Sequence, residues 1–183
     1  MRMDLHRYNQ AMKSAAHAHR NQRYNSDNDT PFIAHPFFVA GVLERYGFDE
    51  DTVIAGLLHD AVEDTDMTIE DVETLFGTRV SGLVREVTFS QNIPWKERQL
   101  QAQQRLPTAS PEAKAIKTAD FIHHLILCTE ELDQGKTTVN QHKPEEYLWK
   151  YTELLQAIGV GWNHPILDEA KKYFEIFKKK AVK

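Results

Sequence analysis

The sequence predicts an all-α protein, a helical bundle in a single domain, and three observations lead to this prediction. Its 183 residues include only 8 glycines and 7 prolines, the residues that most often interrupt regular structure, so long helices are expected. Apolar residues recur at helical spacing along most of the chain, and no segment has the alternation typical of a strand. A chain of this length can bury a core without disulfides or a structural metal.

The first half of the chain predicts helices separated by one polar loop. A helix is expected over residues 5–19, followed by a loop over residues 21–30 that is rich in Asn, Asp and Ser. Pro36 suits the first turn of the next helix, and Gly47 ends it. The run over residues 53–58 is apolar on nearly all sides, so it should form a central buried helix.

After residue 60, a proline or a side chain suited to N-capping precedes most of the expected helices. Thr68 and Ser110 are the clearest caps, because Asp71 stands three residues after Thr68 and Pro111 follows Ser110 directly. The expected helices cover residues 68–77, 80–87, 95–107, 111–126, 144–158 and 165–180.

Charge and cysteine content exclude several classes of protein. The formal net charge is −5, so a strongly basic nucleic-acid binder is not expected, and no apolar run is long enough to span a membrane. Cys128 is the single cysteine, which excludes an intramolecular disulfide and a cysteine-rich zinc site. We therefore expect a cytoplasmic protein without a nucleic-acid or membrane partner, in which histidines and carboxylates would hold any metal.

Histidine is in excess, with 9 residues, and one histidine stands in an acidic cluster. His59 and Asp60 end the buried apolar run, and Glu63 and Asp64 follow one turn later. If the helix continues through this motif, the spacing is i,i+4 for both pairs, and four polar groups gather at one end of a core helix. Such groups need partners, and a divalent cation is a suitable one. A solvated helix end is the alternative interpretation.

Two further residues accompany this cluster. His35 precedes Pro36 at a helix start, and Asp120 lies in an apolar stretch of the expected long helix. A carboxylate in an apolar stretch needs a partner, and an ion pair with Lys117 would supply one without any metal.

Three motifs of the chain resemble those of a known family. They are His35-Pro36, His59-Asp60-Ala-Val-Glu63-Asp64-Thr65 and Lys117-Thr-Ala-Asp120. In this order and spacing, the chain resembles the HD-domain hydrolases of the RelA/SpoT type, most closely the stand-alone small alarmone hydrolases of the metazoan SpoT homologue type. The resemblance covers about residues 10–175 and implies one HD-type helical domain over residues 1–183. It also implies an enzyme that removes pyrophosphate from the 3′ oxygen of guanosine tetra- or pentaphosphate, giving GDP or GTP.

The resemblance assigns roles to residues at matching positions. The residues that match the metal ligands of the family, typically for Mn²⁺, are His35, His59, Asp60 and Asp120. Glu63 and Asp64 match the acidic pair that orients and activates the attacking water. A metal-bound water has a lowered pKa, and a nearby carboxylate can take its proton, so the chemistry is consistent with these roles.

The residues expected to bind the substrate depart from the family pattern. Arg23 is present in the nucleotide-binding loop, but Tyr24 and Asn25 stand where the family usually has a basic pair. His124 replaces an asparagine that usually contacts the ribose. Further candidates for contacts with phosphate or base are Lys96, Arg98, Lys143 and Tyr147. Exposed Lys and Arg side chains on helices are mostly just solvated, so these candidates are chosen only by their position in the chain.

Two alternatives to alarmone hydrolysis remain open. An HD hydrolase of another phosphorylated nucleotide, such as a dinucleotide phosphate or a nucleoside monophosphate, is favoured by Tyr24, Asn25 and His124. An inactive nucleotide-sensing module is the alternative of another class. The presence of Glu63 and Asp64 argues against it, because an inactive copy would be expected to lose the acidic pair first.

Overall fold

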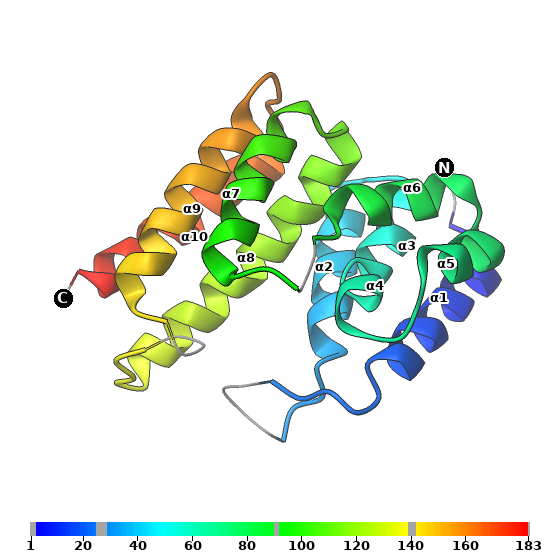
Figure 1. Cartoon of the computed structure of the whole chain (residues 1–183), viewed down its shortest axis with the longest axis horizontal. Coiled ribbons are helices and arrows are strands. Elements are labelled where there is room, and N and C mark those ends of the chain that lie inside the picture. Colours follow the sequence, from blue (N-terminus) through cyan, green and yellow to red (C-terminus); the bar gives the residue numbers. More distant parts are fainter. Residues whose placement is uncertain (1–2, 25–28, 90–91, 139–141, 183) are drawn as a thin grey trace.

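The computed structural model describes residues 3–24, 29–89, 92–138 and 142–182, and these residues form an all-α structure (Figure 1). The helices are α1 (Leu5–Ala18), α2 (Ala34–Arg45), α3 (Glu50–Leu58), α4 (Ala61–Asp64), α5 (Ile69–Phe76), α6 (Thr78–Val87), α7 (Trp95–Arg105), the 3₁₀ helix η1 (Leu106–Thr108), α8 (Pro111–Asp133), α9 (Pro144–Gly159) and α10 (Pro165–Ala181). Within the described ranges, extended pairing is limited to an isolated bridge between Arg23 and Pro31. The predicted fold class is confirmed.

The helix starts agree with the capping signals in the sequence. Thr68 and Asp71 form a reciprocal capping box at the start of α5. The Ser110 side chain accepts a hydrogen bond from the Ala113 backbone at the start of α8, and Pro111 occupies the first helical position. These side chains satisfy backbone donors that have no partner inside the helix, which is why such residues fix helix starts.

Helix α3 is the centre of the N-terminal part of the fold. All of its residues from Thr52 to Leu58 are buried, and it packs against α1, α2, α6 and α8. Gly56 allows α2 to approach closely, because a Cβ atom at this position would lie 2.4 Å from Leu43 Cδ1. The close packing of α2 on α3 brings the start of α2 near the end of α3.

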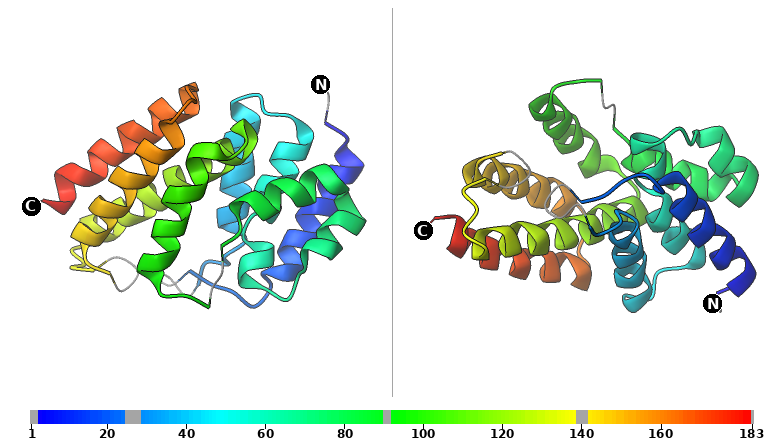
Figure 2. Two further views of the ribbon diagram at one scale, coloured as in Figure 1. Left: turned by 45° about the horizontal axis from the view of Figure 1, so that its top comes forward. Right: turned by 90° about the horizontal axis from the view of Figure 1, so that it is seen from below.

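Helix α8 connects the two parts of the molecule. It contacts α2, α3 and α6 on one side and α9 and α10 on the other, while α7 packs against α9 (Figure 2). Helices α1 and α10 lie at opposite ends of the long axis (Figure 1). The buried apolar residues of both parts form one continuous core. A polar cavity lies where α4, α7, α8 and α9 face one another.

The expectation that residues 59–64 continue the buried helix is wrong. Helix α3 ends at Leu58, His59 and Asp60 form a turn, and a separate short helix α4 begins at Ala61. The His59 ring binds the Gly56 carbonyl oxygen, with 2.8 Å between Nδ1 and O. A side-chain bond to the last turn of a helix competes with helix continuation, which explains the break.

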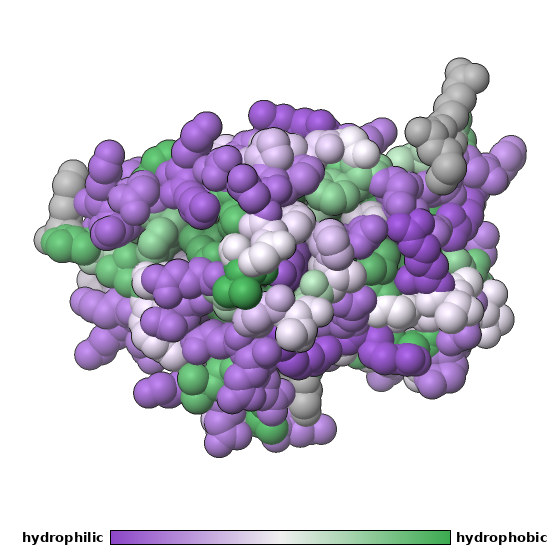
Figure 3. All heavy atoms as spheres, turned by 90° about the horizontal axis from the view of Figure 1, so that it is seen from above, coloured by the Kyte–Doolittle hydropathy of each residue, from purple (hydrophilic) through white to green (hydrophobic). Residues whose placement is uncertain are grey.

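The face of the molecule seen in Figure 3 is mostly hydrophilic, with apolar side chains between the polar ones. The large apolar side chains that are exposed among the described residues come from different helices, for example Leu5 of α1, Leu100 of α7 and Ile176 of α10. Among the described helices, none has both the length and the apolar composition needed to cross a membrane.

Candidate active site

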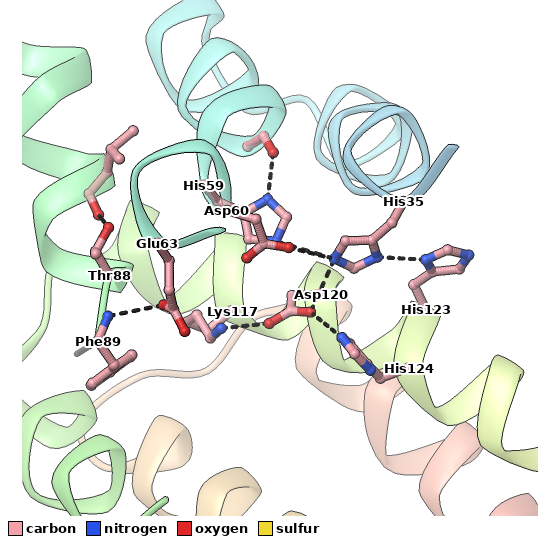
Figure 4. A network of polar contacts seen from close by, with 12 residues as sticks. His35, His59, Asp60, Glu63, Thr88, Phe89, Lys117, Asp120, His123 and His124 are labelled. Carbon is pink, nitrogen blue, oxygen red and sulfur yellow. Dashed lines mark hydrogen bonds and ion pairs between the residues drawn. The ribbon is translucent and has the colours of Figure 1, made fainter. Parts of the chain in front are cut away.

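The first turn of α2 and the end of α3 bring two buried imidazoles together. His35 and His59 are each 1% exposed, and their Nε2 atoms lie 3.2 Å apart (Figure 4). Pro36 occupies the first turn of α2, where its missing N–H costs nothing, so His35 is held at the very start of the helix.

The tautomer of His59 follows from its hydrogen bond to Gly56. A carbonyl oxygen only accepts, so Nδ1 of His59 carries the hydrogen and donates it over 2.8 Å. In the neutral ring, Nε2 then has a free lone pair that faces the cluster. This is the arrangement in which a histidine binds a metal through one nitrogen and is oriented through the other.

Two carboxylates complete the cluster around His35. Asp60 Oδ2 lies 3.3 Å and Asp120 Oδ1 lies 3.4 Å from His35 Nε2, and Asp60 Oδ1 lies 3.1 Å from His59 Nε2. Burial alone would lower the pKa of His35, but the hydrogen bonds and charges of Asp120 and Asp60 raise it to about 9. Burial opposes ionisation of Asp60 as well, yet His59 and His35 hold its pKa well below the ordinary value.

The predicted partner of Asp120 is present. Lys117 Nζ donates to Asp120 Oδ2 at 2.5 Å, and His124 Nε2 lies 3.2 Å from Asp120 Oδ1. Burial opposes the charge of Asp120, but Lys117 and His124 hold its pKa well below the ordinary value. The Asp120 carboxylate therefore contacts Lys117 through Oδ2 and the two histidines, His35 and His124, through Oδ1.

The donor set fits a divalent cation. In two groups of side chains, the possible ligand atoms all lie within 4.8 Å of one another. The first group is His35, His59 and Asp60, and the second is His35, Asp120 and His124. Oδ1 of Asp120 is buried and accepts no hydrogen bond of good geometry within the described residues, although two ring nitrogens flank it. A buried carboxylate oxygen without a donor needs a positive partner, and imidazole with carboxylate is an ordinary ligand set for such a metal.

The two acidic residues of α4 have different environments. Glu63 accepts hydrogen bonds from the Phe89 backbone at 3.0 Å and from Arg98 Nη1 at 3.2 Å, so its carboxylate is fixed in place. Asp64 lines the cavity, and burial together with the charges of Asp60 and Glu63 raises the pKa of Asp64 to about 7. Asp64 can therefore accept and release a proton near neutral pH.

These acidic residues face a cavity of about 230 Å³. Its lining combines acidic, basic and aromatic side chains from α3–α4, α7, α8 and α9. The lining includes Asp60, Glu63, Asp64, Trp95, Arg98, Lys117, Asp120, Phe121, His124, Tyr147 and Lys150. A lining with both negative and positive side chains suits a ligand that brings both a metal and phosphate groups.

Of the residues expected to bind substrate, three line this cavity and four do not. Arg98, His124 and Tyr147 are in its lining. Those outside the lining are Arg23, Tyr24, Lys96 and Lys143. Asn25 lies outside the described residues.

The four residues outside the lining differ in what surrounds them. The Arg23 guanidinium donates to the Gln22 carbonyl at 3.0 Å, and Lys96 Nζ lies 5.8 Å from the Trp149 ring centre. Lys143 is exposed at the start of α9. Tyr24 is half-buried, and burial raises the pKa of its hydroxyl to about 12. The substrate roles of these four residues remain predictions.

Two residues near the site were not among the sequence candidates. His123 Nδ1 lies 2.6 Å from His35 Nδ1, on the side of the His35 ring away from the carboxylates, while His124 on the next position faces Asp120 (Figure 4). Their separation agrees with the expectation that adjacent helical residues point about 100° apart. Lys150 also lines the cavity and lies one turn after Tyr147 on α9. Because residues three apart share a helix face, this spacing could have identified Lys150 from the sequence.

Comparisons with known proteins agree with the fold and the motifs. The HD domain family matches residues 11–147. Guanosine-3′,5′-bis(diphosphate) 3′-pyrophosphohydrolase MESH1 of Mus musculus is 37% identical over 169 residues, covering 91% of this chain and 92% of the mouse protein. The protein of the same name from Drosophila melanogaster is 40% identical over 178 residues, covering 96% of each chain. A solved structure of a metazoan ortholog of SpoT that hydrolyses ppGpp superposes with a TM-score of 0.83 at 32% identity, covering 96% of this chain and 97% of the other.

Proposed function

The chain belongs to the HD-domain family, and on this premise we propose that it is a metal-dependent guanosine-3′,5′-bis(diphosphate) 3′-pyrophosphohydrolase. The reaction releases pyrophosphate from the 3′ oxygen of the alarmone and leaves GDP or GTP. Relatives named for this activity match over nearly their whole length, and the related solved structure is that of a protein that hydrolyses ppGpp.

The observation that carries the proposal is the set of contacts made by His35 Nε2. One imidazole nitrogen and two carboxylate oxygens, from His59, Asp60 and Asp120, lie 3.2–3.4 Å from this atom. In this proposal these four residues hold the metal, which is Mn²⁺. A bound divalent cation supplies Lewis-acid activation of water and neutralises phosphate oxygens.

The residues around this cluster supply proton transfer and substrate orientation. The Asp64 carboxyl, with a pKa of about 7, can take a proton at its oxygen and return it to solvent. Glu63 is locked by Phe89 and Arg98 and so orients groups that bind beside it. The buried Tyr147 ring lies in the same cavity and offers an apolar surface to the guanosine moiety.

One observation favours a second candidate, an HD hydrolase of another phosphorylated nucleotide. His124 Nε2 contacts Asp120 Oδ1 at 3.2 Å, so this residue takes part in the histidine–carboxylate cluster. An imidazole in that contact has less capacity for the ribose contact that the asparagine of the family usually makes. A different sugar or a different phosphate position on the substrate would be compatible with this change.

A release assay separates these candidates. The protein is incubated with Mn²⁺ or with a chelator and with a panel of nucleotides that includes the guanosine tetraphosphate, dinucleotide phosphates and nucleoside monophosphates. Metal-dependent release of pyrophosphate from the guanosine tetraphosphate is the expected result. Inorganic phosphate from another nucleotide would support the second candidate, and absence of turnover with every substrate would contradict both.

The cellular location is also part of the proposal. A cytoplasmic location is supported by the single, buried Cys128, since proteins of oxidising compartments more often use cysteines in pairs.

A further inference from the structure

Lys150 occupies an unusual place in the cavity. It projects from the middle of α9 into the same space as the acidic residues of α4 and α8. Its ammonium nitrogen lies 5.0 Å from the ring centre of Tyr151, 5.5 Å from Tyr147 and 6.0 Å from Phe121. All three rings are buried, and at these distances they stabilise the charge of the ammonium group by cation–π contact.

The other two permanent cations of the cavity have carboxylate partners. Lys117 is paired with Asp120 and Arg98 is paired with Glu63. Among the described residues, no carboxylate oxygen lies within ion-pair distance of Lys150 Nζ. Within the described part of the chain, Lys150 is therefore the basic side chain of this cavity that has no carboxylate partner.

The charge of Lys150 is unfavourable in the free protein. Burial, together with the nearby charges of Lys117 and Arg98, lowers its pKa to about 8, while Asp120 acts in the opposite direction. A cation that is partly desolvated and has no anionic partner gains strongly when a ligand supplies one. The geometry and the charge therefore both favour an anion at this position.

The cavity as a whole identifies the kind of anion. The lining carries four carboxylates and three basic side chains, so with all of them ionised a bound divalent metal leaves an excess of one positive charge, and protonation of Asp64 increases this excess. A phosphoryl group suits this excess, since it can bring oxygens both to the metal and to an ammonium group. A simple carboxylate would offer fewer oxygens and less charge.

We propose that Lys150, held by the rings of Phe121, Tyr147 and Tyr151, is an anion subsite that binds a phosphoryl group of the substrate opposite the metal cluster. The identification of this group as part of a substrate rests on the proposed function, but binding of a phosphoryl anion to the subsite does not require turnover.

The test is a calorimetric titration of inorganic pyrophosphate into the Mn²⁺-loaded protein at pH 7. Lys150→Met removes the charge and keeps the length of the side chain, Lys150→Arg keeps the charge, and Lys171→Met removes an exposed lysine of α10 as a matched control. Loss of one charge-assisted hydrogen bond weakens pyrophosphate binding about 10- to 100-fold in Lys150→Met. Lys150→Arg retains most of the affinity, and Lys171→Met binds like the wild type.

The outcomes separate the subsite from the enzyme activity. An affinity of Lys150→Met within twofold of the wild type, or no detectable binding of pyrophosphate to the wild type, would overturn the subsite even if the alarmone is hydrolysed. If no nucleotide is hydrolysed but pyrophosphate binding still depends on Lys150, the subsite stands and the proposed function fails. Circular dichroism and a thermal melt of each variant show that it is folded.

Discussion

Replacing Lys150 by Met should stabilise the metal-free, ligand-free protein, and the gain should depend on pH. The pKa of Lys150 is lowered from the ordinary value of 10.5 to about 8 in the folded protein. At 1.36 kcal/mol per pKa unit, this difference corresponds to about 3 kcal/mol of destabilisation by the charged form. Because the side chain is only partly buried, we expect about 1–3 kcal/mol.

The pH dependence follows from the sign of the shift. Below pH 8 both the folded and the unfolded chain carry the proton on Lys150, so the full destabilisation is present. Between about pH 8 and 10.5 the folded protein loses this proton while the unfolded chain keeps it, so the destabilisation fades as the pH rises. Met carries no charge, so the advantage of the variant should be largest at pH 7 and fall below about 1 kcal/mol at pH 10.

Urea unfolding of the wild type and Lys150→Met at pH 7 and at pH 10 measures this difference, with Lys171→Met as the exposed control. The charged groups that face Lys150 from the neighbouring helices are Lys117, Asp120 and His124 of α8 and Arg98 of α7, and the thiol of Cys128 lies nearby on α8. These residues are all present in the variant, but the loss of the Lys150 charge removes its lowering effect on the pKa of His124 and of Cys128. An equal gain at both pH values, or no gain at pH 7, would refute the electrostatic explanation.

Three further predictions concern the metal, the general base and the core. Asp60→Ala should abolish Mn²⁺ binding, while Glu63→Ala should keep the metal and lose turnover. Metal analysis after gel filtration measures the metal content of both variants, and a full metal content in Asp60→Ala would mean that the ligand assignment is wrong. In the Mn²⁺-loaded wild type, kcat/KM should rise with pH as Asp64 loses its proton, with a midpoint below the pKa of about 7 of the metal-free protein, because the cation offsets the Asp60 charge that raises this pKa. Asp64→Asn should lower kcat about 100-fold or more and remove this rise. A variant with the same pH profile would exclude Asp64 as the base. Tyr151→Phe should raise the free energy of unfolding by about 1 kcal/mol, because the buried Tyr151 hydroxyl lacks a hydrogen-bond partner within the described residues; a loss of stability in urea would reveal a partner.

Much of the helical framework could be predicted from local signals. The caps at Thr68 and Ser110 and the prolines at the starts of α8, α9 and α10 act within one helical turn, so the sequence contains all the atoms involved. The break between α3 and α4 could not be predicted in this way. The spacing of residues 59–64 is compatible with a continuous helix, and only the structure shows that the His59 ring turns back to the Gly56 carbonyl.

The candidate site, too, was only partly predictable from the sequence. The motifs of the chain pointed to His35, His59, Asp60 and Asp120, and the structure brings these four side chains together. Their role as metal ligands remains a prediction. Position along the chain was a poorer guide for isolated basic residues. Arg98 lines the cavity but Lys96, two residues earlier on α7, does not, because the two side chains leave the helix in different directions.

The sequence by itself determined the all-α class, the helix starts and the donor types available for a metal, since each depends on residue identity and short spacing. Only the tertiary structure decided which atoms meet. The packing of α2 on α3 brings the Nε2 atoms of His35 and His59 together. The packing of α9 against α8 and α7 places Lys150 in the acidic cavity, where no carboxylate of the described residues pairs with it. Burial and partners are properties of several helices at once, so the charge state of Lys150 cannot be read from α9 alone.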